Sequence, residues 1–297
     1  YGSTGSIYFD TVGQLYANTP MQVLAFIFFF TGMGFKISLV PFHLWTADVY
    51  EGSPVNVTSY FSVISKGASV FILIMVMFTV FHSIAFLWKD IVYLIAITTM
   101  VIGNLFALRQ KNMKRFLAFS SIAQAGFIML GILGGNKIGM TATVYFVLVY
   151  IFSNLGAFGV VSAISAMTGK ESMDDYDGLY ATNPKLSLLM TLSMFSLAGI
   201  PPIAGFFGKF FLFTSAASGG YYWLVFIAVL NATISLYYYL LVVKAMFINK
   251  SDNPIAFFKS DLTTRVALMI CAIGIFAIGF WSQVYEFIDS VTFAIRN

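Results

Sequence analysis

The chain has 297 residues, of which 59% are hydrophobic and only 9% are charged, and its formal net charge is +4. A soluble domain carries about 25% charged residues, so a chain this apolar is expected to lie in lipid rather than in water. The single cysteine, Cys271, excludes an internal disulfide and is interpreted as a small buried or lipid-facing residue.

The first stretch, YGSTGSIYFDTVGQLYANT (1–19), is small and polar, and we expect a loop outside the membrane with at most a short interfacial helix. The chain begins at Tyr1 and no signal-peptide pattern precedes the first apolar run, so we expect a piece or a processed form of a longer protein.

The rest of the chain is dominated by long apolar runs. A membrane-spanning helix needs about 20 mostly apolar residues, and no run alternates as barrel strands do. We therefore predict an all-α polytopic membrane protein with about eight spanning helices. They lie at roughly 20–46, 56–81, 86–108, 115–134, 138–167, 185–216, 221–248 and 262–288.

The cationic residues are divided unevenly between the two sets of loops. Ten of the sixteen Lys and Arg residues lie on the side reached after the first span, and three lie on the opposite side. Because cytoplasmic loops are enriched in Lys and Arg, the first set is predicted to be cytoplasmic and the C-terminus to be on the outer side. The first set is Arg109, Lys111, Lys114, Arg115, Lys170, Lys185, Lys244, Lys250, Lys259 and Arg265; the second is Lys89, Lys137 and Arg296.

The three remaining cations, Lys36, Lys66 and Lys209, fall inside the predicted spans. A lysine at a helix centre costs roughly 2.5–3.5 kcal/mol, so these side chains are expected to face protein or water rather than lipid. Lys66, in SVISKGASVF, lies near the midplane, where its side chain cannot reach either surface. A buried lysine that loses and regains a proton is a candidate proton carrier. The alternative is a structural lysine bonded to backbone carbonyls or to an acid on another helix.

Prolines accompany two of these lysines. Lys36 precedes Pro41 in GFKISLVPFHLW, and Lys209 follows Pro201 and Pro202 in LAGIPPIAGFFGKFFLF. Proline frees carbonyls that must find partners in protein or water, so we predict two broken spans beside polar cavities. A kink that only shapes packing is the alternative. The two broken spans run in opposite directions, and the Gly-Phe-Lys and Phe-Gly-Lys neighbourhoods echo each other, which suggests an inverted repeat.

Further polar side chains interrupt the apolar runs. In FSSIAQAG, Ser120, Ser121 and Gln124 lie within about one helical turn and are candidates to hold water or pass a proton, with helix-to-helix hydrogen bonding as the alternative. His43 is a candidate proton shuttle or a cap for the carbonyls freed by Pro41.

Other polar residues have simpler favoured interpretations. These are helix-to-helix hydrogen bonding for Asn154, Asn231 and Ser235, an interfacial position for His82, and solvation at the cytoplasmic mouth for Asp48 and Glu51, with lining of an entrance left open.

Sequence patterns for redox and nucleotide chemistry are missing. The chain has no cysteine cluster for an iron–sulfur centre, no histidine pair spaced for haem, no GxGxxG after a strand and no Walker loop. We therefore expect no cofactor and no metal in this chain, and no nucleic-acid partner.

Four stretches carry a family resemblance: GFKISLVPFHLWTADVYEGSPVNVTSYFSVISK, KRFLAFSSIAQAG, SLAGIPPIAGFFGKFFLF and ISLYYYLLVVKAMF. They closely resemble the antiporter-like subunits of respiratory complex I, the NADH–quinone oxidoreductase, and above all the bacterial subunit N family. The resemblance implies a fourteen-helix inverted-repeat fold, of which this chain would hold the last eight helices. In that fold 20–81 would close the first repeat, 86–248 would be the five-helix second repeat, and 262–297 the final helix and C-terminus.

The resemblance also implies a function: relay of protons through Lys36, Lys66 and Lys209, driven by quinone reduction elsewhere in the complex. Other membrane subunits, the lipid bilayer, protons and internal water would be the partners, and the location a bacterial inner (plasma) membrane. NADH, FMN, iron–sulfur clusters and quinone would be bound by other subunits.

Two departures limit what is carried over from the family. The glutamate that pairs with the first lysine in the family precedes this sequence. Related subunits often have histidine where Gln124 stands, and glutamine can only orient water. A subunit of a cation/proton antiporter or membrane-bound hydrogenase, and a non-pumping membrane scaffold, are the alternatives.

Overall fold

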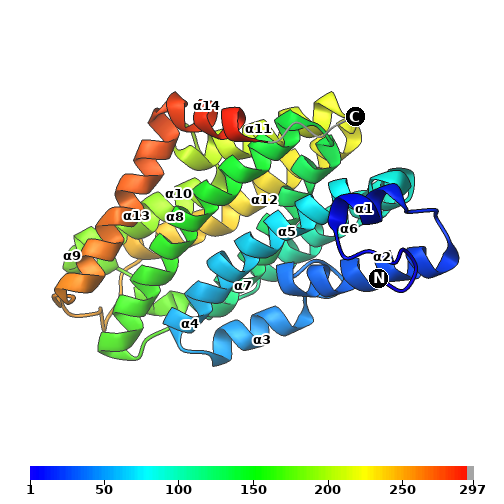
Figure 1. Ribbon diagram of the computed structural model, residues 1–297. Coiled ribbons are helices and arrows are strands. Elements are labelled where there is room, and N and C mark those ends of the chain that lie inside the picture. The colour runs from blue at the N-terminus through cyan, green and yellow to red at the C-terminus, as the bar shows by residue number, and fades with distance from the viewer. Residues whose placement is uncertain (293–297) are drawn as a thin grey trace.

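The computed structural model describes residues 1–292, and nearly all of them are helical (Figure 1). Within these residues, seven helical segments are long and apolar enough to cross a membrane: Pro20–Ile37, Val55–Thr79, His82–Ala107, Met113–Gly134, Lys137–Thr168, Tyr222–Phe247 and Leu262–Phe280. Two shorter helices, α10 (Pro184–Ala198) and α11 (Ala204–Ser218), follow one another across a break and together match the remaining predicted span. The prediction of an all-α polytopic membrane bundle with two broken helices is confirmed.

Apart from α10 and α11, the α-helices of residues 1–292 are the long segments above, numbered in chain order, and the shorter helices between or beside them. They are α1 (Phe9–Gln14), α2 (Pro20–Ile37), α3 (Leu44–Gly52), α4 (Val55–Tyr60), α5 (Lys66–Thr79), α6 (Ala85–Ala107), α7 (Met113–Gly134), α8 (Lys137–Thr168), α9 (Leu179–Thr182), α12 (Tyr222–Phe247), α13 (Leu262–Phe280) and α14 (Ser282–Val291). A π-helical turn, Phe61–Ser65, joins α4 to α5. The break that separates α2 from α3 begins before Pro41, because the residue preceding a proline is pushed out of the helical region.

Polar side chains fix where several helices begin. Thr19 and Gln22 form a capping box at the start of α2, and Asn112 accepts backbone hydrogen bonds at the start of α7. Asn136 and Asp261 do the same for α8 and α13. The first amide groups of a helix have no partner within it, so these caps define the helix starts close to the predicted positions.

The centre of the bundle is α7, which is buried along its length and is surrounded by α3, α6, α8, α11 and α12. Small residues let the neighbours approach closely: a Cβ atom at Gly103 of α6 would lie 2.6 Å from the backbone nitrogen of Ala123. The α1–α2 pair lies at one edge of the bundle and α13 at the other (Figure 1). The sequence FSSIAQAG, on α7, is therefore in the interior.

The predicted span 262–288 is wrong at its C-terminal end. α13 ends at Phe280, and after Trp281 the chain turns away into the separate helix α14 (Figure 1). The 19 residues of α13 already extend about 28 Å, close to the thickness of the apolar layer, so the polar residues that follow are no longer part of a span. Arg296, which was counted with the far-side cations, lies outside the described residues.

Candidate functional site

Lys66 is the most enclosed of the three predicted intramembrane lysines. It follows the π-helical turn at the start of α5, and it is 2% exposed. Its Nζ donates to the side-chain oxygen of Ser121 on α7 at 2.5 Å and to the carbonyl oxygen of the same residue at 3.1 Å. The Tyr150 hydroxyl of α8 donates to the same serine Oγ at 2.8 Å. Lys66 thus lies in a small cluster of hydroxyl groups beside a π turn, a feature frequent at functional sites.

Two structural roles are the alternatives for Lys66: an ion pair with an acid on another helix, and hydrogen bonding to backbone carbonyls. Among residues 1–292, no Asp or Glu forms an ion pair with this lysine. A backbone carbonyl contact is present, but it is one of two bonds, and the second goes to the Ser121 hydroxyl, which can both accept and donate. The cluster therefore has the chemistry to exchange a proton as well as to hold a charge.

Lys209 is buried beside the second helix break. It lies on α11, is 4% exposed, and its Nζ donates to the carbonyl oxygen of Ala198 at 2.9 Å. Ala198 is the last residue of α10, and its carbonyl is freed because Gly199 leaves the helix with φ = 87° and Pro201 and Pro202 follow. The same ammonium lies 4.7 Å from the centroid of the Phe127 ring on α7. The predicted association of a broken helix with a lysine is confirmed here.

Side chains of α7 and α12 connect the surroundings of the two lysines. Gln124 donates from Nε2 to the carbonyl of Leu197 at 3.0 Å and to the Tyr239 hydroxyl at 3.1 Å. Tyr239 in turn is 2.5 Å from the hydroxyl of Ser120.

We refer to Lys66, Ser121, Ser120, Tyr239, Gln124 and Lys209 as the polar chain. Two links of the polar chain are made by adjacent residues. Ser121 and Ser120 are consecutive on α7, and the carbonyl of Leu197, which accepts from Gln124, is followed by that of Ala198, which accepts from Lys209. The polar chain runs across α7, in the buried centre of the bundle.

Two of the three residues assigned to helix-to-helix bonding have that role. Asn154 of α8 donates to the Ser62 hydroxyl at 2.8 Å, and Asn231 of α12 accepts from Asn104 of α6 at 2.9 Å. Ser235 differs: it donates to the Ala232 carbonyl on its own helix, a local bond that serine hydroxyls often make within helices.

Lys36 is placed differently from the other two lysines. It is exposed on α2, one residue before the helix ends, and the expectation that it faces protein or water rather than lipid stays a prediction. Its exposure follows from its position on the helix, because the buried residues near this end of α2 are Gly34 and Ile37. The structure does not bring Lys36 together with Lys66 or Lys209.

The break after Lys36 is lined by polar groups. The Val40 amide donates to Thr99 Oγ1 on α6 at 3.0 Å, and Pro41 is exposed. Within residues 1–292, Ser38 Oγ, His43 Nδ1 and Thr46 Oγ1 are buried without a hydrogen-bond partner. Such buried polar atoms usually bond to ordered water, so the predicted polar cavity at this break is chemically consistent with the structure. The shuttle role of His43 stays a prediction.

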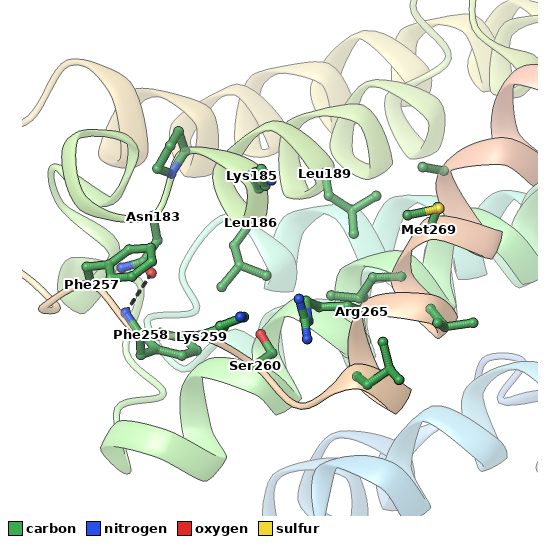
Figure 2. Close-up of a pocket in the computed structure, with 15 residues that line it drawn as sticks. Asn183, Lys185, Leu186, Leu189, Phe257, Phe258, Lys259, Ser260, Arg265 and Met269 are labelled. Atoms are coloured by element: carbon green, nitrogen blue, oxygen red, sulfur yellow. Dashed lines mark hydrogen bonds between the residues drawn. The ribbon is translucent and has the colours of Figure 1, made fainter.

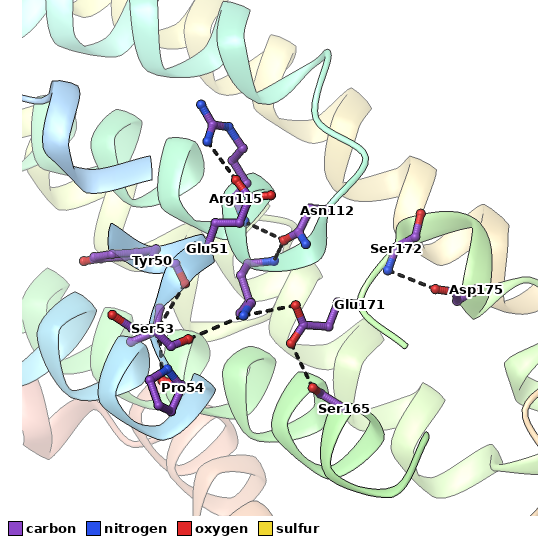
Figure 3. Close-up of polar contacts among 12 residues, drawn as sticks. Tyr50, Glu51, Ser53, Pro54, Asn112, Arg115, Ser165, Glu171, Ser172 and Asp175 are labelled. Carbon is purple, nitrogen blue, oxygen red and sulfur yellow. Dashed lines mark hydrogen bonds and ion pairs between the residues drawn. The ribbon is translucent and has the colours of Figure 1, made fainter. Parts of the chain in front are cut away.

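Ion pairs join α3 to the start of α7, and Figure 3 shows the contact between Arg115 and Glu51. Asp48 and Glu51 of α3 accept from Arg115 of α7 at 2.6 and 2.7 Å, so they are paired rather than merely solvated. The adjacent Lys114 donates to Glu171 at 3.0 Å. These pairs tie α3 to the start of α7 and to the loop after α8.

The sequence reasoning missed Tyr150 and Tyr239, which supply hydroxyls to the cluster around Lys66 and to the polar chain. Their only signal was register: Tyr150 lies four residues before Asn154, and Tyr239 four after Ser235, on shared helix faces. His82 is exposed with Nδ1 near the Thr79 carbonyl, in agreement with an interfacial position.

No metal centre accompanies these groups in the described part of the chain, where no cluster of three His, Cys, Asp or Glu residues is placed to hold an ion. What the interior offers instead is amines, hydroxyls and amides, which suit proton exchange and hydrogen bonding.

Comparison with known proteins identifies the family. The sequence profile described as "NADH:quinone oxidoreductase/Mrp antiporter, TM" matches residues 1–235. The chain belongs to this family. It is 53% identical over 290 residues to NADH-quinone oxidoreductase subunit N of Phocaeicola vulgatus, covering 97% of this chain and 61% of that relative.

Solved structures agree on the fold. A chain in respiratory complex I from Thermus thermophilus with bound aureothin matches with a TM-score of 0.79 and 31% identity, over 96% of this chain and 62% of that one. A chain of the Mrp complex from Dietzia sp. DQ12-45-1b matches with a TM-score of 0.89 at 20% identity, over 97% and 62%, which shows the fold alone. The chain thus spans about three fifths of the length of the relatives it matches.

Proposed function

We propose that this chain is part of a proton-translocating membrane subunit of NADH–quinone oxidoreductase. The observation that carries the proposal is the polar chain, which links two buried lysines from α5 through α7 to α11. Membership of the family and the similarity to subunit N relatives support it. The drive would come from quinone reduction in other subunits, which would bind NADH, FMN, iron–sulfur clusters and quinone.

In the proposed relay, Lys66 passes a proton to the Ser121 hydroxyl, which accepts it on one lone pair and releases its own to a water molecule that hands it on toward Ser120. Ser120 and Tyr239 continue the path with a second pair of hydroxyls. Between Tyr239 and Lys209 only an amide and backbone carbonyls intervene, and these do not titrate. We propose that water makes this last step, oriented by the Oε1 atom of Gln124, which is buried without a partner within residues 1–292.

The parts outside the polar chain have proposed roles too. Lys36, exposed on α2, would meet its carboxylate partner in the portion of the protein that precedes this sequence. The cation-rich loops would be cytoplasmic, with the C-terminus on the outer side of a bacterial inner membrane. We further propose that 20–81 and 86–248 belong to two inverted repeats, with 262–297 outside them.

The test is made on the intact complex in sealed vesicles. Lys66→Ala is expected to cut quinone-linked NADH oxidation and acidification sharply while the complex still assembles. Lys66→Arg should do little better, because a guanidinium does not release its proton. Lys250→Ala, which changes an exposed lysine outside the spans, serves as the control and should leave both rates unchanged.

Two results would redirect the proposal. If both Lys66 variants pump like the parent, this lysine is not a relay group and the scaffold alternative gains. If proton movement follows an imposed sodium gradient and does not follow NADH oxidation, a cation/proton antiporter is the better description.

A further inference from the structure

A groove lies between the start of α10, the loop before α13 and α13 itself (Figure 2). It encloses about 720 Å³, which is within the range of pockets that hold ligands. Most of its lining is aliphatic or aromatic. Its apolar wall consists of Leu186, Leu189, Val266, Leu268, Met269 and Ala272.

One end of the groove is cationic. Lys185, Lys259 and Arg265 line it together with Ser260. In Figure 2 the side chains of Lys259 and Arg265 extend toward one another, although like charges repel. None of these three cations forms an ion pair within residues 1–292.

The backbone adds positive potential at the same end. α10 begins at Pro184 and α13 at Leu262, and both residues line the groove. The N-terminus of a helix carries a partial positive charge, so that of α10 adds to the three cations here. The nearby acid, Asp261, uses its carboxylate to cap the Thr264 amide of α13. This end of the groove therefore favours an anion.

The groove borders two apolar helices, α10 and α13, at the level where they pass into loops. Its wall is open to the surroundings, since Met269 is 61% and Val266 48% exposed. A water-soluble anion would gain nothing from such a wall. An amphipathic anion would use both parts of the groove.

We propose that this groove binds an anionic phospholipid of the leaflet that faces the cation-rich loops. The phosphate lies among Lys185, Lys259 and Arg265, where it relieves their mutual repulsion and accepts from the Ser260 hydroxyl. An acyl chain lies along the apolar wall between α10 and α13. Basic pockets between membrane helices on the cytoplasmic side are known to recognise anionic headgroups in this manner. The inference requires that the chain spans a membrane, and it does not depend on the proton relay.

The experiment uses the purified intact complex and a phosphatidylglycerol that carries a photoreactive group on its acyl chain. After irradiation, labelled peptides are mapped by mass spectrometry. The expected label lies on the apolar wall, within 186–189 and 266–272. Unlabelled phosphatidylglycerol should compete for the site, and phosphatidylcholine should compete far less. This comparison needs no substitution, so it stands even if a variant fails to assemble.

The matching variant neutralises the cationic end: Lys185→Gln, Lys259→Gln and Arg265→Gln combined. Because each surface cation contributes to binding an anionic lipid, the three together should weaken labelling roughly 10- to 100-fold. The control combines Arg109→Gln, Lys111→Gln and Lys250→Gln, three exposed cations that do not line the groove, and should label like the parent.

Three results would overturn the proposal. One is equal competition by phosphatidylcholine, and another is unchanged labelling of the Lys185, Lys259 and Arg265 variant. The third is a groove that takes no lipid label but cross-links to a neighbouring protein subunit, which would make it a protein interface.

Discussion

The polar chain predicts a sharp difference between two adjacent tyrosines, Tyr238 and Tyr239. Both are buried on α12, at 1% and 0% exposed, and each offers one hydroxyl. That of Tyr239 lies 2.5 Å from Ser120 and 3.1 Å from Gln124, between the two lysines. That of Tyr238 donates to Asn104 of α6 at 2.8 Å. Tyr239→Phe and Tyr238→Phe therefore each remove one hydroxyl group from an almost fully buried side chain.

The two substitutions should have similar effects on folding stability but different effects on proton transfer. Each substitution leaves buried partners unsatisfied, at about 1–3 kcal/mol, so both should destabilise the subunit to a similar degree. Only Tyr239→Phe interrupts the polar chain. If the missing hydroxyl bond raises the transfer barrier by about 1–1.5 kcal/mol, transfer through this step slows about 5- to 12-fold.

The assay is acidification per NADH oxidised by the intact complex in sealed vesicles, alongside thermal unfolding. Tyr239→Phe should lower acidification several-fold and Tyr238→Phe should not, at matched unfolding temperatures. Equal acidification by both variants would refute the assignment of Tyr239 to the path.

Two further predictions concern packing and pH. A Cβ atom at Gly205 would lie 1.6 Å from the Ser196 carbonyl oxygen, so Gly205→Ala should prevent assembly, whereas Gly52→Ala, with open space around it, should assemble normally on native gels. Burial alone would raise the pKa of Glu171, but the hydrogen bonds from Lys114 and Ser165 and the charge of Lys114 together outweigh burial, so the pKa is lowered from 4.5. The pair therefore stabilises the fold above pH 4.5 and is lost as pH falls through the lowered pKa. The thermal-stability deficit of Glu171→Gln at neutral pH should disappear in acid; a deficit that persists would contradict this.

Charge and proline carried most of the information that the sequence held about the site. A lysine in an apolar run has few acceptable surroundings, so Lys66 and Lys209 could be predicted to be buried, and Pro201 and Pro202 predicted the break that frees the Ala198 carbonyl. Serines and a glutamine on α7 could be recognised because they interrupt an apolar helix.

The rest depends on packing between distant segments. Tyr150 and Tyr239 each combine an apolar ring with a polar hydroxyl, and no local sequence pattern predicts which neighbour that hydroxyl contacts. The exposure of Lys36 depends on which face of α2 contacts the neighbouring helices. The turn at Trp281 comes where α13 is already long enough to cross the apolar layer. The boundaries of the repeats stay a prediction.

The central claim is that Lys66 and Lys209 lie on one proton path, and a double-mutant comparison tests it most directly. The measured quantity is acidification per NADH oxidised for Lys66→Gln, Lys209→Gln and the two combined, in an intact complex with confirmed assembly. Groups that act in series are not independent, so the double variant should lose no more than the more severe single variant. Losses that multiply in the double variant would mean that the two lysines act separately, and would contradict a single path through the polar chain.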